Sequence, residues 1–153
     1  MQPFLLPPME RIRNWREFRQ SFGTDETDEE QLLKTAKYWQ SFPISKYYLD
    51  IDDPKNWPTP WEILYEGDYC QSTLAYMMEQ TLLLADERWT TDRLKLYLID
   101  DKVKSDIFII LVADAKYVIN YSHFDIINFD FVENNCIIQH EYLAVTPQSH
   151  TIV

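Results

Sequence analysis

The chain has very few glycines and cysteines for its 153 residues: two of each. Because glycine adopts positive φ angles most readily, tight left-handed turns must be rare or built on Asn and Asp. Two cysteines form no disulfide framework, so we expect a reducing, intracellular setting. The sequence has no zinc-type spacing of Cys and His and no glycine-rich phosphate loop, so we expect no metal site and no cofactor.

Long apolar runs and basic residues are also scarce. No apolar segment approaches the roughly 20 residues that cross a bilayer. The start contains prolines and no basic lead, so we expect neither a membrane contact nor a signal peptide. Acidic residues outnumber Lys and Arg by 25 to 14, which gives a net charge of −11. This charge argues against a nucleic-acid partner. It keeps an aromatic-rich protein soluble, or it suits a protein partner with a basic patch.

Apolar and aromatic residues, in contrast, are abundant. Hydrophobic residues make up 46% of the chain and aromatic residues 15%, as in a globular protein. The length is typical of one domain, so we expect residues 1–153 to fold as a single domain. Within it, we expect residues 1–8 to form an extended, proline-rich arm and residues 146–153 to form a tail.

Helix signals dominate the first half of the chain. Apolar residues at helical spacing predict a helix that begins at Pro8 and ends at Gly23. Thr27–Glu30 is a capping box, which predicts the start of a second helix that stops before Pro43. Ile44–Ile51 is predicted to be extended.

The centre of the chain predicts two further helices. Thr59–Glu62 is a second capping box, and Gly67 is expected to close the short helix that follows in a left-handed conformation. Asp68 is expected to cap the next helix, which places Cys70 in its first turn and ends near Ala85.

The second half changes to strand patterns. Three apolar segments bounded by turn residues are predicted strands: Leu94–Ile99, Ile107–Val112 and Tyr117–Tyr121. The second of these is apolar at every position, as in a central strand covered on both faces. Phe129–Val132 and Cys136–Ile138 are predicted to form a hairpin around Asn134 and Asn135. The predicted fold is α+β: N-terminal helices, then a Cys-bearing helix packed on a mostly antiparallel sheet of about five strands.

Cys70 is the residue most suggestive of chemistry. At a helix start, the unpaired N–H groups and the positive end of the helix dipole favour a thiolate, which is how many cysteine nucleophiles are presented. The alternative is a small packing residue that is inert for want of access.

The Gly67–Cys70 segment, followed by hairpin-joined apolar strands, resembles the transglutaminase-like (papain-related) cysteine superfamily. The resemblance implies a nucleophilic Cys at the start of a helix, a His on a following strand, and an orienting Asp or Asn after the next. Cys70 matches the nucleophile and Asn120 matches the orienting residue. The His is expected near Asp106 or Ile107, where the chain has none, and His123 is the nearby imidazole.

The Trp57–Trp61 segment, with the Gly67–Cys70 segment after it, also resembles an uncharacterised protein family of tailed phages of cyanobacteria. This resemblance implies a phage protein located in the host cytoplasm or the virion. Two Trp and two Pro in five residues form a rigid aromatic corner, which either docks a partner or locks its loop onto the Cys70 helix.

These patterns leave three functions open. The first is a non-enzymatic phage accessory or virion-associated interaction protein on a transglutaminase-like scaffold that lacks the catalytic base. Its partner-binding residues would be Trp57, Trp61, Arg11, Arg13, Arg16 and Arg19. The second is a cysteine-dependent hydrolase or acyltransferase in which Cys70 attacks, His123 is the base and Asn120 orients it. The third is an acidic inhibitor of a host protein. The sequence leaves the oligomeric state open.

Overall fold

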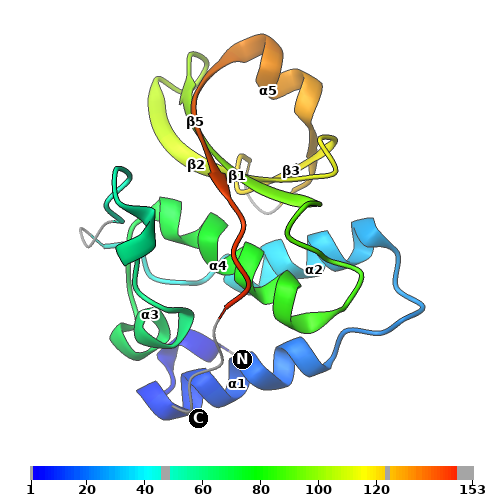
Figure 1. Ribbon diagram of the computed structural model, residues 1–153. Coiled ribbons are helices and arrows are strands. Elements are labelled where there is room, and N and C mark those ends of the chain that lie inside the picture. The colour runs from blue at the N-terminus through cyan, green and yellow to red at the C-terminus, as the bar shows by residue number, and fades with distance from the viewer. Residues whose placement is uncertain (1, 46–48, 123–124, 148–153) are drawn as a thin grey trace.

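Helices cover both faces of a five-stranded antiparallel sheet in the computed structural model, which describes residues 2–45, 49–122 and 125–147 (Figure 1). The strands are β1 (Leu94–Asp101), β2 (Asp106–Ala113), β3 (Tyr117–Ile119), β4 (Ile127–Asn128) and β5 (Cys136–Leu143). Their order in the sheet is β4-β3-β2-β1-β5. The prediction of an α+β fold with a sheet of about five antiparallel strands is confirmed.

The helices are α1 (Pro8–Gln20), α2 (Asp28–Trp39), α3 (Pro60–Glu66), α4 (Gln71–Ala85) and α5 (Phe129–Asn135), with short 3₁₀ helices η1 (Pro3–Leu5) and η2 (Pro54–Asn56). Both predicted capping boxes are present, at Thr27–Glu30 before α2 and at Thr59–Glu62 before α3. Gly67 ends α3 with a φ of 92°, as expected for a left-handed cap. None of the helices in the described ranges has the length and apolar character that a membrane span needs.

Strand β2 is the central strand of the sheet and is covered on both faces from Phe108 onward, as its apolar sequence predicts, whereas Ile107 is exposed. It pairs with β1 on one side and β3 on the other. Ile109 and Leu111 pack into the core that contains α4, whereas Ile110 and Val112 pack into a second core beneath α5. Because side chains alternate along a strand, each face of β2 joins a different helical layer.

A buried threonine organises the core of the helical layer. The indole N–H groups of Trp15 in α1 and Trp39 in α2 both donate to the hydroxyl of Thr81 in α4, at 3.0 and 3.1 Å. The same hydroxyl donates to the main-chain oxygen of Met77 at 2.6 Å. One side chain therefore satisfies two buried aromatic donors and fixes three helices relative to one another.

The start of the Cys70 helix differs from the prediction. Asp68 does not cap it: α4 begins at Gln71, and Cys70 occupies the N-cap position with an extended backbone. The reason is non-local. Tyr69 forms a parallel bridge with Ile44, and its N–H donates to the carbonyl of Pro43. This pairing keeps the chain extended up to Cys70.

The predicted hairpin at residues 129–138 is wrong in its first half. Phe129–Asn135 is helix α5, and Asn134 and Asn135 lie in its last turn. The side chain of Asn128 accepts a hydrogen bond from the N–H of Asp130, which caps the helix. Phe129 and Val132, one helical turn apart, are buried against the sheet, and the ring of Phe129 stacks on Tyr97.

The proline-rich arm is not extended along its length. Pro3–Leu5 forms the 3₁₀ helix η1, and the buried ring of Phe4 stacks on Trp39 at a centroid distance of 5.1 Å. The surface on which this arm docks is therefore the chain's own helical layer. The predicted extended segment Ile44–Ile51 lies partly outside the described residues.

Candidate functional site

Cys70 lies at the N-terminal end of α4 and is partly buried. Its carbonyl accepts the N–H of Thr73 at 3.0 Å, and its sulfur lies 3.4 Å from the hydroxyl oxygen of Thr73. Thr73 is fully buried. The partner of the thiol is therefore a hydroxyl from the first turn of its own helix.

Arg11 holds the segment that leads to Cys70. Its guanidinium donates to the carbonyl oxygens of Leu64 and Tyr65, both at 2.7 Å, at the C-terminal end of α3. A Cβ atom on Gly67 would lie 3.0 Å from a guanidinium nitrogen of Arg11. The absence of a side chain at Gly67 therefore permits both the left-handed turn and this contact.

Asn120 links the first turn of α4 to the sheet. Its side-chain amide donates to the carbonyl oxygen of Ile109 in β2 at 2.9 Å and to that of Gln71 in α4 at 3.4 Å. The N–H of Ile109 in turn donates to the hydroxyl of Ser72 at 3.1 Å. Asn120 has a φ of 69°, a conformation that Asn tolerates better than most residues. The structure thus brings Asn120 to the end of α4 at which Cys70 lies.

The resemblance to the cysteine superfamily places a His near position 106 or 107, at the start of β2, where the chain has Asp106 and Ile107. Ile107 lies two residues before Ile109 and therefore on the same face of β2, and 52% of its surface is exposed. His140 lies on β5, which β1 separates from β2, and its ring contacts Tyr142 at a centroid distance of 4.5 Å. His123 lies outside the described residues. Within the part of the chain that the structure describes, no imidazole is placed beside Cys70 and Asn120.

The aromatic corner is used for packing. Trp57 is partly buried and contacts Tyr76 of α4 and Tyr142 of β5, at centroid distances of 5.3 and 5.0 Å. Trp61 is buried and meets Trp15 of α1 edge to face at 5.8 Å. These contacts lock the corner onto the helical layer and the sheet.

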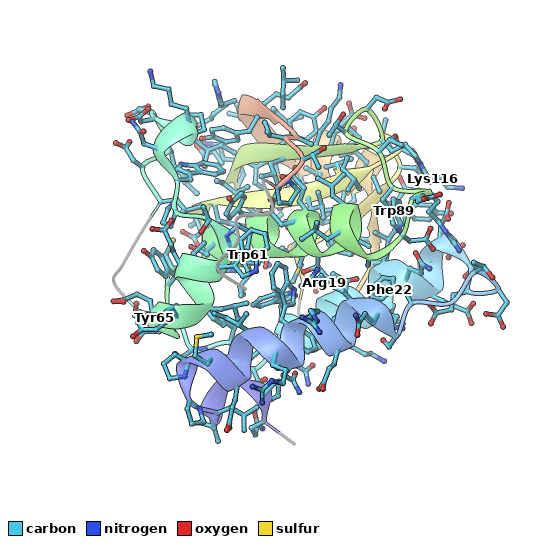
Figure 2. The ribbon with its side chains drawn as sticks, turned by 60° about the horizontal axis from the view of Figure 1, so that its bottom comes forward. Arg19, Phe22, Trp61, Tyr65, Trp89 and Lys116 are labelled. Carbon is cyan, nitrogen blue, oxygen red and sulfur yellow. The ribbon has the colours of Figure 1, made fainter. Side chains whose placement is uncertain are left out.

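The four arginines of α1 have different surroundings. Arg11 bonds to the end of α3, whereas Arg13 and Arg16 are exposed. The guanidinium of Arg19 lies 4.2 Å from the ring centroid of Trp15, between α1 and α4 (Figure 2). Burial, and then the charge of Arg16, lower the pKa of Arg19 to about 10.

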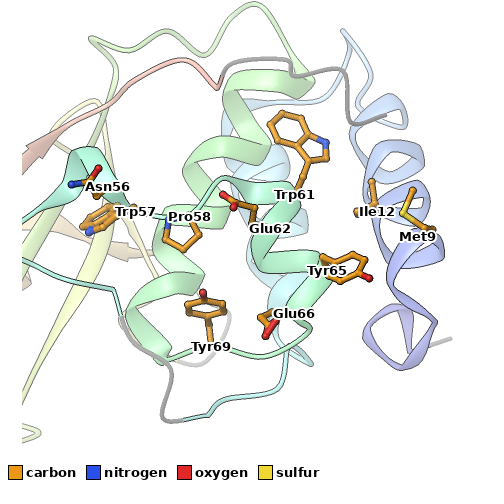
Figure 3. A pocket seen from close by; sticks show the side chains of 10 residues that line it. All are labelled: Met9, Ile12, Asn56, Trp57, Pro58, Trp61, Glu62, Tyr65, Glu66 and Tyr69. Carbon is orange, nitrogen blue, oxygen red and sulfur yellow. The ribbon is translucent and has the colours of Figure 1, made fainter.

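A pocket of about 660 Å³ opens between α1, α3 and the loop that carries Trp57 (Figure 3). Tyr65 points from α3 toward Met9 of α1, and more than half of each side chain is exposed. Glu62 and Glu66 of α3 give the lining an acidic edge.

Sequence reasoning missed Glu79, a buried acid in the middle of α4. Only 2% of its surface is exposed, and burial raises its pKa to about 8. The available signal was that Glu79 is the only charged residue in Gln71–Ala85, an otherwise apolar and polar-neutral helix. Burying a carboxyl group is costly unless the group is neutral or has hydrogen-bond partners.

Comparison of the sequence with protein-family models and with curated proteins gives no match. Solved structures do match. Calcium-bound LapG of Legionella pneumophila aligns with a TM-score of 0.63 and 12% identity, covering 92% of each chain. Another LapG structure covers 88% of this chain and 84% of its own at 12% identity, and an EGTA-treated form covers 86% and 81% at 11%, both with a TM-score of 0.63.

The chain has a transglutaminase-like fold. At this identity the likeness concerns the arrangement of helices and strands and leaves the chemistry to the residues themselves. It agrees with the expectation from the Cys70 segment and the strands that come after it. The expected phage origin has no counterpart among these structures and stays a prediction.

Proposed function

We propose that the chain is a non-enzymatic interaction protein that uses a transglutaminase-like scaffold without a working catalytic base. One observation carries the proposal. Beside the first turn of α4, β2 carries Ile109, with Ile107 two residues before it on the same face, and the amide of Asn120 bonds to main-chain oxygens. A Cys–His–Asn site needs an imidazole between the sulfur and the carboxamide.

The pocket between α1 and α3 supports the interaction role. Exposed apolar side chains that lie together mark interaction sites, and Met9 and Tyr65 are both exposed on the lining of this pocket. The acidic edge formed by Glu62 and Glu66, together with the net charge of −11, favours a partner surface that is apolar with basic residues at its border. The exposed Arg13 and Arg16 extend the predicted partner surface along α1.

A cysteine hydrolase is the second candidate, and two observations favour it. Asn120 is placed near the start of the Cys70 helix, and LapG is a transglutaminase-like cysteine protease. In this alternative Cys70 attacks a carbonyl carbon, His123 takes the thiol proton and Asn120 orients the imidazole.

Calcium is not part of the proposal. One LapG structure is calcium-bound. Among the residues described for the present chain, no group of three or more His, Cys, Asp or Glu side chains is placed to hold a metal ion. The donor set therefore does not fit a calcium site within the described ranges, and we derive no step through the ion.

Acylation by p-nitrophenyl acetate tests the proposal without knowledge of a natural substrate. A cysteine activated by an imidazole attacks this ester, releases nitrophenol in a burst and becomes acetylated. We expect the wild type and Cys70→Ala to release nitrophenol at the same rate, without a burst. A burst in the wild type that is absent from Cys70→Ala, with acetyl-Cys70 detected by mass spectrometry, would overturn the proposal in favour of the hydrolase.

A further inference from the structure

A second pocket, of about 550 Å³, lies between α4, the segment around η2 and strand β5. Cys70 is not among the residues that line it, and Glu79 lies more than two helical turns further along α4. The pocket is therefore separate from the Cys70 site, and a ligand could bind there whether or not Cys70 is catalytic.

Glu79 lines this pocket with one carboxyl oxygen unpaired. Its Oε1 accepts a hydrogen bond from the amide of Gln80 at 3.3 Å, and its buried Oε2 has no partner among the described residues. Gln80 also donates to the carbonyl of Val145 at 3.1 Å, so its amide is already shared. A buried carboxyl group without a partner is costly, and a ligand that supplies the missing partner recovers that cost.

Three aromatic rings stand around the same pocket. Trp57 contacts both Tyr76 and Tyr142, and all three line the cavity. Their polar atoms are occupied: the Trp57 indole donates to the carbonyl of Asp50, and the Tyr142 hydroxyl donates to that of Ile51. The Tyr76 hydroxyl likewise donates to a main-chain oxygen, that of Pro58. The rings are thus held in place by their polar ends, and they offer π surface and apolar edges to the cavity.

The electrostatic surroundings favour a cation. Burial is the largest cause that raises the pKa of Tyr76, and the charges of Glu79 and Glu62 raise this pKa further. Burial likewise is the largest cause that raises the pKa of Tyr142, and the charges of Asp52 and Asp50 add to it. Four acidic side chains thus lie near the rings, and one lysine, Lys55, is on the lining.

We propose that this pocket binds an alkylammonium group, with the carboxylate of Glu79 as its counter-ion and Trp57, Tyr76 and Tyr142 around its alkyl chain and charged head. An ammonium ion supplies the N–H donors that Oε2 lacks. Its charge is attracted to the aromatic faces, and its methylene groups fill the apolar part of the cavity. The ammonium belongs either to a small free amine or to a lysine side chain of another protein.

Binding should release a proton from Glu79. Because burial raises its pKa to about 8, the protonated form predominates at neutral pH, and an ammonium ion beside it stabilises the carboxylate. Other titratable groups face the site from the elements around it: Tyr76 from α4, Glu62 from α3, Lys55 from η2, and His140, Glu141 and Tyr142 from β5. The site of proton release must therefore be assigned with a variant.

Titration calorimetry with n-butylammonium chloride near neutral pH, in two buffers of different ionisation enthalpy, tests the site. We expect saturable binding that releases close to one proton, and binding of neutral n-butanol that is about tenfold weaker or more. Glu79→Gln, which keeps the size of the side chain, should lose both the affinity, by about tenfold or more, and the proton release. Glu17→Gln removes an exposed acid of α1 that is not part of the lining; it is the control and should bind as the wild type does.

Equal affinity for n-butanol and n-butylammonium, or unchanged binding by Glu79→Gln, would overturn the proposal. If Glu79→Gln does not fold, Trp57→Leu takes its place: weaker butylammonium binding supports the site, and unchanged binding contradicts it. Nα-acetyl-lysine amide distinguishes the two sources of the ammonium group. Comparable binding identifies a lysine side chain as a ligand, and binding of butylammonium alone identifies a small free amine.

Discussion

The side-chain amide of Asn120 donates a hydrogen bond to the main-chain oxygen of Ile109, at 2.9 Å. The same amide donates to the main-chain oxygen of Gln71 at 3.4 Å, so it joins the backbone of β2 to the first turn of α4. In the described structure the side chain of Asn120 therefore has a structural role.

This role predicts a loss of stability when Asn120 loses its donor. Asn120→Asp keeps the size of the side chain but replaces the amide with a carboxylate that faces two carbonyl oxygens. We expect a cost of about 1–3 kcal/mol in the free energy of unfolding, measured by urea denaturation. Asn120→Gly is the control for the backbone, because glycine accepts the positive φ without strain. An Asp variant as stable as the wild type would show that the hydrogen bonds contribute nothing.

Thr81 is expected to be the most sensitive polar residue in the helical core. Thr81→Val keeps the shape of the side chain and leaves the indole N–H groups of Trp15 and Trp39 buried without an acceptor. At about 1–3 kcal/mol for each unsatisfied donor, the variant should lose on the order of 2–6 kcal/mol of stability. Thr81→Ser retains the hydroxyl and should lose much less. The prediction fails if thermal unfolding finds the two variants equally stable.

Glu79 should make the protein less stable as the pH rises. Its folded-state pKa of about 8 lies above the ordinary value of 4.5, so the native state binds its proton more tightly than the unfolded state. The associated stability is fully present below about pH 4.5 and is lost progressively as the pH rises through about 8.

Glu79→Gln isolates this effect, because the remaining titratable groups are common to both proteins. Relative to the wild type, the variant should gain stability between about pH 5 and 8, by on the order of a few kcal/mol, and the difference should then level off. Urea denaturation across this range measures it. A difference that is constant with pH would mean that Glu79 is ionised in the folded protein throughout.

Local signals were enough to predict much of the helical half. The Thr27–Glu30 and Thr59–Glu62 boxes and the left-handed Gly67 depend on interactions within a few residues, and all three are present. The central position of β2 could also be predicted, because a strand that is apolar on both faces requires cover on both.

The failures have non-local or ambiguous causes. The pairing of Tyr69 with Ile44 shifts the start of α4 to Gln71, and no neighbouring residue signals it. Phe129 and Val132 fit a helical face as well as a strand, and the Asn128 cap decides between them. For the candidate site, the family spacing pointed to Asn120, but only the structure shows that its amide bonds to the main chain. The residues of β5 that share a pocket with Glu79 lie far from it along the chain, so the sequence could not predict that they line the same pocket.

The most direct test of the central claim is the rate of Cys70 alkylation by iodoacetamide as a function of pH. It is measured in a Cys136→Ser background, with and without His123→Ala. Burial, followed by the charge of Asp101, raises the pKa of Cys136 to about 11, so this thiol would in any case react slowly with the reagent.

If Cys70 has no catalytic base, labelling should be slow at about pH 6, and His123→Ala should leave the rate unchanged at every pH. Rapid labelling at about pH 6 that slows when His123 is removed would reveal a thiolate–imidazolium pair. That result would contradict the account and make the chain a cysteine enzyme.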